Sequence, residues 1–370
     1  MLAFFIFLNF LLLYMILAVY AERKVSAFIQ DRLGPMEIGP YGIGQTVADL
    51  LKLLQKEDIV PDQADAWTFR AAPLVIFVAV FAGFAVMPLT PDLQGSGAAV
   101  GVFYLLAIIS VDIIGLLMAG WSSNNKYSLL GAMRSVAQII SYEVPVALSV
   151  LCVAVYCHSL DLQEISFQQG IYANAARPSA PAGEVTVNYL FGLRALGVDV
   201  TAAGGLLAWN LVRMPLFGVV YVIFFIATLA ECNRAPFDIP EAESELVGGF
   251  HTEYSGFRWA MLFLAEYGMM LLVSLLGAVL FLGSWNTPFP NVGPVRLADW
   301  TSGAPGTVYG NVTGAFWLIA KAFGAIFVQM WVRWTYPRLR VDQLMYLCWK
   351  VLTPAALVLL FVSAVWRLLG

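Results

Sequence analysis

The chain has 370 residues, of which 60% are hydrophobic and only 12% are charged, with a formal net charge of −4. A mean hydropathy of +0.79 excludes an ordinary soluble domain, and so small a net charge gives no reason to expect a nucleic-acid partner.

Continuous apolar runs of about 20 residues are the length needed to cross the hydrocarbon core as helices. They show no ten-residue alternation, which argues against membrane strands. We therefore predict an all-α, polytopic membrane protein with one integral membrane domain over residues 1–370. The eight predicted transmembrane helices cover residues 1–21, 70–89, 98–120, 128–157, 206–230, 257–283, 312–335 and 345–369.

Basic residues set the predicted orientation of these spans. Fourteen of the 20 Lys and Arg residues flank one set of loops, the predicted inner loops at 22–69, 121–127, 231–256 and 336–344. Only four flank the predicted outer loops at 90–97, 158–205 and 284–311. The positive-inside rule then places both termini outside, on the periplasmic face of a bacterial inner membrane. The first run has no basic residues before it, so we do not expect a cleavable signal peptide.

Cysteine and histidine offer no pattern for a redox centre. Cys152, Cys157, Cys232 and Cys348 show no CxxC spacing, and cysteines in apolar spans usually act as small hydrophobic residues. The two histidines, His158 and His251, fall on opposite predicted faces. We predict no metal, haem, flavin or iron–sulfur cluster on this chain, which excludes a b-type cytochrome.

The loop after the first span contains a short helical pattern. Val47, Leu50, Leu51 and Leu54 recur at helical spacing, with polar residues on the other face. About three turns cannot cross a bilayer, so we expect an amphipathic helix along the inner surface or against a partner. Surface anchoring alone would also explain it. The outer loops at 158–205 and 284–311 suggest no chemistry, and the lack of an internal repeat argues against a common transporter fold.

Five ionisable residues lie within predicted spans: Asp112, Glu143, Arg213, Glu266 and Lys321. Glu143, Glu266 and Lys321 are far from their span ends, and a charge facing lipid there costs a few kcal/mol. They should face the protein interior or a hydrated cavity, where proton handling is one role and a static ion pair is the other. Arg213 is close enough to an outer end to reach the surface, and Asp112 remains open to a purely structural role.

Residues 230–256, AECNRAPFDIPEAESELVGGFHTEYSG, carry the highest density of acids in the chain. The six carboxylates are Glu231, Asp238, Glu241, Glu243, Glu245 and Glu253. Pro240 with Glu241 and Glu243 suits a helix start, but helix capping accounts for only some of the acids. Two interpretations stay open: a loop that docks a basic partner, or a water-filled acidic funnel into the membrane.

Several segments together resemble the H subunit of bacterial proton-pumping NADH:quinone oxidoreductase, respiratory complex I. They are AERKVSAFIQDRLGP, GPYGIGQTVADLLKLLQKEDIVP, SYEVP, the 27-residue acidic segment, FLAEY and WVRWTYPRLRVDQLMYLCWK, and they extend from the first span to the last. The resemblance implies a membrane subunit without a redox centre, at the junction of the membrane and peripheral arms. Its partners would be the quinone-site subunits of the peripheral arm and adjacent membrane-arm subunits.

By the same resemblance, quinone is the substrate and this subunit forms the membrane side of its chamber. The residues implied for the chamber are Glu22, Arg23, Lys52, Arg234 and Asp238. Those implied or suggested for the proton path are Glu143, Glu231, Glu241, Glu243, Glu245, Glu253, Glu266 and Lys321.

The chain departs from the family pattern at two positions. Glu37 of GPMEIGP stands where a basic residue is common, and Cys232 stands where Thr is usual. Two other functions remain open from the residues. One is the homologous membrane subunit of an energy-converting hydrogenase or formate-linked complex, and the other is a stand-alone proton-coupled transporter.

Overall fold

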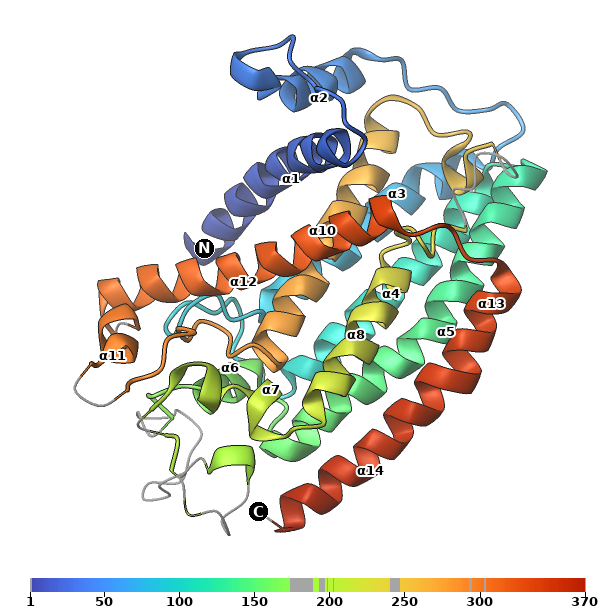
Figure 1. The fold of residues 1–370 in the computed structure, drawn as a ribbon. Coiled ribbons are helices and arrows are strands. Elements are labelled where there is room, and N and C mark those ends of the chain that lie inside the picture. The colour runs from blue at the N-terminus through green and yellow to red at the C-terminus, as the bar shows by residue number, and fades with distance from the viewer. Residues whose placement is uncertain are drawn as a thin grey trace.

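The protein is a bundle of long helices (Figure 1) in a computed structural model that describes residues 2–173, 189–192, 197, 199–201, 203–239, 247–292, 295–302 and 304–369. The longer helices are α1 (Leu2–Ile29), α3 (Ala66–Gly83), α4 (Gly101–Ser122), α5 (Lys126–Cys157), α8 (Phe217–Glu231), α10 (Gly256–Leu280), α12 (Val308–Thr335) and α14 (Thr353–Leu369). The shorter ones are α2 (Gln45–Gln55), α6 (Leu162–Phe167), α7 (Asn210–Arg213), α11 (Leu297–Thr301) and α13 (Val341–Tyr346). Over these ranges no β-strand forms.

Six stretches within the described residues are long and apolar enough to cross a membrane. They are Ala66–Val86, Gly101–Ser122, Lys126–Cys157, Gly256–Leu280, Val308–Thr335 and Val341–Leu368. The predicted class, a polytopic helical membrane protein, is confirmed. Each of the six falls on a predicted span, whereas the total of eight stays a prediction.

The first and fifth predicted spans take different forms from those expected. The first lies within α1, which continues as one helix to Ile29, eight residues past the predicted end. The fifth, predicted as one helix over 206–230, is divided into α7 and the 15-residue α8. Pro215 lies at the division, and proline lacks the backbone N–H that a continuous helix requires there.

Helix α10 is the centre of the bundle. In its most apolar window 83% of the residues are buried within the chain, against 28% in α12 and 22% in the α13–α14 segment. The outward faces of α12 and α14 are therefore left for lipid or for neighbouring proteins.

Side-chain contacts show which helix ends lie together. Tyr14 of α1 stacks on Phe323 of α12, and Glu22, later in α1, contacts Arg333, later in α12. The two helices therefore run parallel. At the far end of α14, Trp366 Nε1 donates to the Phe191 carbonyl. Both chain ends therefore lie on the side of α6, α7 and α11, opposite α2 (Figure 1). Two chain ends on the same side are expected when the chain crosses the membrane an even number of times.

Two prolines inside helices leave carbonyls that other elements satisfy. Pro73 of α3 frees the Phe69 carbonyl, which accepts a 3.2 Å hydrogen bond from the Tyr254 hydroxyl. Pro145 of α5 frees the Ser141 carbonyl, which accepts from the Cys348 thiol at 2.9 Å. Since an unpaired buried carbonyl costs free energy, these contacts fix α3 and α5 against the loop before α10 and the start of the last span.

The predicted surface helix is α2, which lies across the C-terminal end of α1 (Figure 1). Its Val47, Leu51 and Leu54 side chains stay exposed on this chain, as expected of a helix that rests on lipid or a partner. The loop that follows is held to α10 by an Arg258–Asp58 ion pair of 2.6 Å. Gly256, with φ +58°, permits this approach, because a Cβ there would lie 3.2 Å from the Lys56 carbonyl oxygen.

Candidate functional site

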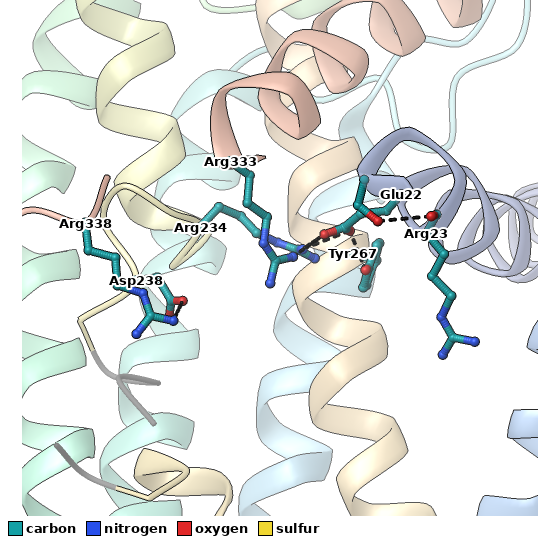
Figure 2. A network of polar contacts seen from close by, with 8 residues as sticks. Glu22, Arg23, Arg234, Asp238, Tyr267, Arg333 and Arg338 are labelled. Atoms are coloured by element: carbon teal, nitrogen blue, oxygen red, sulfur yellow. Dashed lines mark hydrogen bonds and ion pairs between the residues drawn. The ribbon is translucent and has the colours of Figure 1, made fainter. Parts of the chain in front are cut away.

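A buried carboxylate in the C-terminal part of α1 joins three other segments of the chain. Glu22 is only 5% exposed. It accepts hydrogen bonds from Arg234 Nη1 at 3.0 and 3.1 Å, from Arg333 Nη1 and from the Tyr267 hydroxyl. Figure 2 shows the two guanidinium groups converging on it. We call Glu22, Arg234, Tyr267 and Arg333 the Glu22 cluster.

Electrostatics explain how these charges are tolerated away from water. Burial opposes the charge on Arg234, but the Glu22 carboxylate beside it raises the pKa of that guanidinium well above its ordinary value. The Arg234 guanidinium carbon also lies 4.3 Å from the centre of the Tyr267 ring, an attractive cation–π arrangement. The Glu22 cluster therefore connects α1, α10, α12 and the acidic segment through charge-assisted contacts.

Arg23, the next residue, points away from this cluster (Figure 2) and toward α2. Its Nη1 lies 2.5 Å from Asp49 Oδ2, and Lys52 Nζ lies 3.8 Å from the other oxygen of Asp49. Burial acts to raise the pKa of Asp49, but the hydrogen bond and charge of Arg23 outweigh it and hold that pKa below its ordinary value of 3.8. Asp49 is thus ionised at neutral pH and keeps the two basic side chains together.

These residues form the polar end of a cavity between α1, α2 and α10. Its volume is about 170 Å³. Arg23, Asp49 and Lys52 line it together with apolar side chains that include Ile16, Leu53 and Phe263. An apolar wall with a few charged groups at one end suits an amphipathic ligand with a polar head and a long hydrocarbon tail. We call it the α1–α2–α10 cavity.

The first part of the acidic segment is fixed by contacts with α5 and with the residues after α12. Gln138, buried in α5, donates from Nε2 to the carbonyls of Ala230 and Phe237 at 2.7 and 2.8 Å. Asp238 pairs with Arg338 at 3.1 Å, apart from the Glu22 cluster (Figure 2). Of the predicted chamber residues, the structure thus brings Glu22 and Arg234 together, places Arg23 and Lys52 at one cavity, and leaves Asp238 with a separate partner.

The predicted proton-path acids lie deeper in the bundle. Glu143 of α5 accepts a hydrogen bond from Ser110 of α4. Glu266 of α10 lies 3.4 Å from His251 Nε2. The turn that carries His251 packs closely against α5 at Gly131. A Cβ at Gly131 would lie only 2.7 Å from the Gly249 Cα, so this approach requires a glycine. Glu231, at the end of α8, is 4% exposed.

The remaining predicted residues lie further from this group. Glu253 Oε1 accepts from Asn125 Nδ2 at 2.6 Å, beside the start of α5. Lys321 donates to the backbone carbonyls of Ser284 and Asn286 at 2.7 and 2.5 Å and lies over the Trp209 ring. Within the described residues it pairs with carbonyls and not with an acid. Glu241, Glu243 and Glu245 lie outside the described residues.

Several site residues are not predicted by the sequence. Asp49, Tyr267 and Arg333 all bind a predicted residue directly. Arg333 lies in the WVRWTYPRLRVDQLMYLCWK segment and Tyr267 in the FLAEY segment beside Glu266, but the resemblance assigns a role to neither residue. In the part of the chain that the structure describes, no group of three or more His, Cys, Asp or Glu side chains gathers to hold a metal ion.

The chain matches the family model described as NADH dehydrogenase over residues 2–364. It is 60% identical over 359 residues to the NADH-quinone oxidoreductase H subunit numbered 2 of Cytophaga hutchinsonii, covering 97% of this chain and 96% of that protein. It is 52% identical over 350 residues to the NADH-quinone oxidoreductase H subunit of Chlorobium luteolum, covering 95% and 84%. The H subunit of Chlorobaculum parvum is 49% identical over 348 residues, covering 94% and 86%.

Proposed function

Because the chain belongs to the NADH dehydrogenase family, we propose that it forms the membrane side of the quinone chamber of a proton-pumping NADH:quinone oxidoreductase. In this role it is a subunit without a redox centre, and it links quinone reduction elsewhere in the complex to proton translocation. The relatives at 49–60% identity are named as H subunits of NADH-quinone oxidoreductase. Those names favour a quinone-linked complex over a hydrogenase-linked subunit or a stand-alone transporter.

The α1–α2–α10 cavity is the observation that carries the chamber assignment. A quinone has a redox-active head that needs a few polar contacts and an isoprenoid tail that needs apolar walls. The cavity supplies both, because Arg23, Asp49 and Lys52 stand at one end of an otherwise apolar lining. The Glu22 cluster begins at the preceding residue of α1, so a head group at this end would lie close to a network of buried charges.

The proton-path assignment rests on acids that occupy successive positions in the bundle. Glu231 and Glu266 line one small cavity, and Glu143 lies on α5, held by Ser110 of α4. Reduction of a quinone takes up protons, and carboxylates close to one another change charge in response to such an event. Glu241, Glu243 and Glu245 extend the proposed path toward the inner face by their position in the sequence.

Orientation and partners follow the same proposal. The termini lie outside, on the periplasmic face of a bacterial inner membrane, because most basic flanks lie at the opposite end of the spans. The exposed faces of α12 and α14 and the apolar side of α2 are then available to lipid and to other complex I subunits.

Two adjacent positions of α1 provide a matched test of the chamber. Ile16 lines the α1–α2–α10 cavity, whereas Leu17 lines a separate apolar groove against α12. We expect Ile16→Trp to lower the rate with a long-tailed quinone by about tenfold, the effect of losing roughly 1.4 kcal/mol of binding. Leu17→Trp should leave that rate close to wild type. The measurement is the quinone reductase rate of the assembled complex in each variant. An equal loss of rate in the two variants would contradict the assignment of this cavity to the quinone chamber.

A further inference from the structure

A small cavity lies where α4, α8 and α10 meet, separate from the α1–α2–α10 cavity. Its volume is about 20 Å³. Three carboxylates from three helices line it: Asp112, Glu231 and Glu266. Glu231 and Glu266 already belong to the proposed proton path, whereas Asp112 has no role there.

Two of these carboxylates each carry an oxygen that no described group satisfies. Glu231 is 4% exposed, and its Oε2 is buried without a hydrogen-bond partner. Asp112 Oδ1 is also buried without a hydrogen-bond partner. A buried polar atom left unpaired costs about 1–3 kcal/mol, and more when it is charged, so two such atoms at one cavity need a physical explanation.

Among the described residues that line this cavity there is no Lys or Arg. Arg234, two residues after Cys232, is paired with Glu22 and does not line the cavity. Glu266 on α10 is engaged with His251, Glu143 on α5 is held by Ser110, and Cys232 adds a thiol beside Glu231. Helix α3 contributes only an apolar isoleucine. Two ionised carboxylates here would therefore repel each other in a medium with little screening.

We propose that Asp112 and Glu231 share one proton through a single water molecule held in this cavity, which makes Asp112 a further proton-holding residue of the path. One proton leaves the pair with a single negative charge. It also turns one of the two acceptors into a donor, so that both of the unpaired oxygens, Asp112 Oδ1 and Glu231 Oε2, gain a partner.

The size and lining of the cavity fit this arrangement. A site needs roughly 10–15 Å³ and two or more polar partners to hold one water, and this cavity offers about 20 Å³ and three carboxylates. The protonated carboxyl donates its O–H to the water oxygen, and the water donates to the other carboxylate. When the proton moves, the first O–H bond breaks, the water passes its own proton to the second carboxylate, and the total charge is unchanged.

The functional consequence rests on the proposed function. A pair that holds one proton between α4 and α8 can accept a second one or release the first when a neighbouring carboxylate changes charge. Asp112 would then relay charge between Glu231, in the acidic segment, and the bundle interior.

Infrared spectroscopy of the intact complex tests the shared proton directly. The absorption of a protonated carboxyl group is followed as a function of pH in wild type and in Asp112→Asn, Glu231→Gln and the double variant. Because one proton serves two residues, either single change should shift the frequency and the pH midpoint of the same signal, and only the double change should remove it. Asp112→Glu keeps a carboxyl group and should retain the signal. Asp299→Asn, at an exposed pair with Arg296 on the outer side, is the control for an acid-to-amide change.

An unchanged carboxyl signal in Asp112→Asn, in a complex that assembles on a native gel, would overturn the shared proton. Glu143→Gln separates this result from the proposed function. If Glu143→Gln pumps normally while Asp112→Asn shifts the signal, the proton path fails and the shared proton stands. If Glu143→Gln stops pumping while Asp112→Asn changes neither signal nor pumping, the shared proton alone fails.

Discussion

At the scale of single residues, Glu22 and Arg23 show how neighbours in one helix take different roles. Consecutive side chains of a helix point about 100° apart, so Glu22 faces the bundle and Arg23 faces α2. The sequence predicts that both belong to one site, because they share a motif. It does not predict their separate partners, because these depend on which face of α1 packs inward, and α1 is apolar nearly all round.

The Glu22 cluster leads to a prediction about Arg234. Arg234→Lys keeps the charge but cannot present a planar guanidinium to both oxygens of Glu22 and to the Tyr267 ring. Weaker contacts from this side chain leave the buried negative charge of Glu22 less well neutralised. Complete removal of one partner of a buried ion pair lowers the free energy of unfolding by about 3–5 kcal/mol. We expect Arg234→Lys to lower the thermal stability of the purified complex together with its quinone reductase activity.

Arg338→Lys is the matched control, since Arg338 pairs with Asp238 by one contact and its side chain is 48% exposed. It should change the thermal midpoint little. Equal stability of the two variants would mean that the geometry of the Glu22 cluster does not matter.

At the scale of elements, hydropathy predicts where the long helices lie, but it does not predict where a helix is interrupted. The fourth span, predicted over 128–157, covers Lys126–Cys157. The last, predicted as a simple helix, contains a π-helical turn at Leu347–Leu352, where the Thr353 N–H donates to the Cys348 carbonyl. Pro354 follows directly, and a proline in a helix leaves no N–H to continue the normal ladder. Apolar composition is the same in continuous and interrupted helices, so it cannot distinguish them.

The two ends of α12 test the predicted orientation. Ala304 lies just before this helix and Thr335 is its last residue, and both are exposed. We expect Ala304→Cys to react with a membrane-impermeant thiol reagent in intact spheroplasts. Thr335→Cys should be protected there and react only in inverted vesicles, unless another subunit covers it. Reaction of Ala304→Cys only in inverted vesicles would reverse the assignment of the outer face.

At the scale of the whole molecule, several buried charges gather around the acidic segment of an otherwise apolar bundle. The Glu22 cluster, the Asp238–Arg338 pair and the Glu231–Glu266 cavity all include or adjoin residues of the acidic segment. Sequence composition identifies this segment, because acids are rare elsewhere. It cannot show that Arg338, 100 positions away, pairs with Asp238, or that Arg333, 311 positions away, pairs with Glu22.

The acids that lie outside the described residues, Glu241, Glu243 and Glu245, remain open to two roles that an experiment can separate. If they dock a basic partner, charge removal should weaken assembly in a salt-sensitive way, because exposed pairs are screened beyond a Debye length of about 8 Å. If they line a hydrated path to quinone, Glu→Gln changes should leave the complex intact. They should then lower its quinone reductase activity and shift its pH dependence, since coupled carboxylates titrate as a group.

We expect the second result, because the buried acids Glu231 and Glu266 continue the series into the membrane. Native-gel assembly is compared at low and high salt, and quinone reductase rates are measured from about pH 5.5 to about pH 8.5, a range that brackets raised carboxylate pKa values. Glu37→Gln serves as the control, because Glu37 is an acid of the loop between α1 and α2, outside the acidic segment. Assembly that is lost at high salt and restored at low salt, with normal activity in each assembled complex, would assign these carboxylates to a docking surface instead.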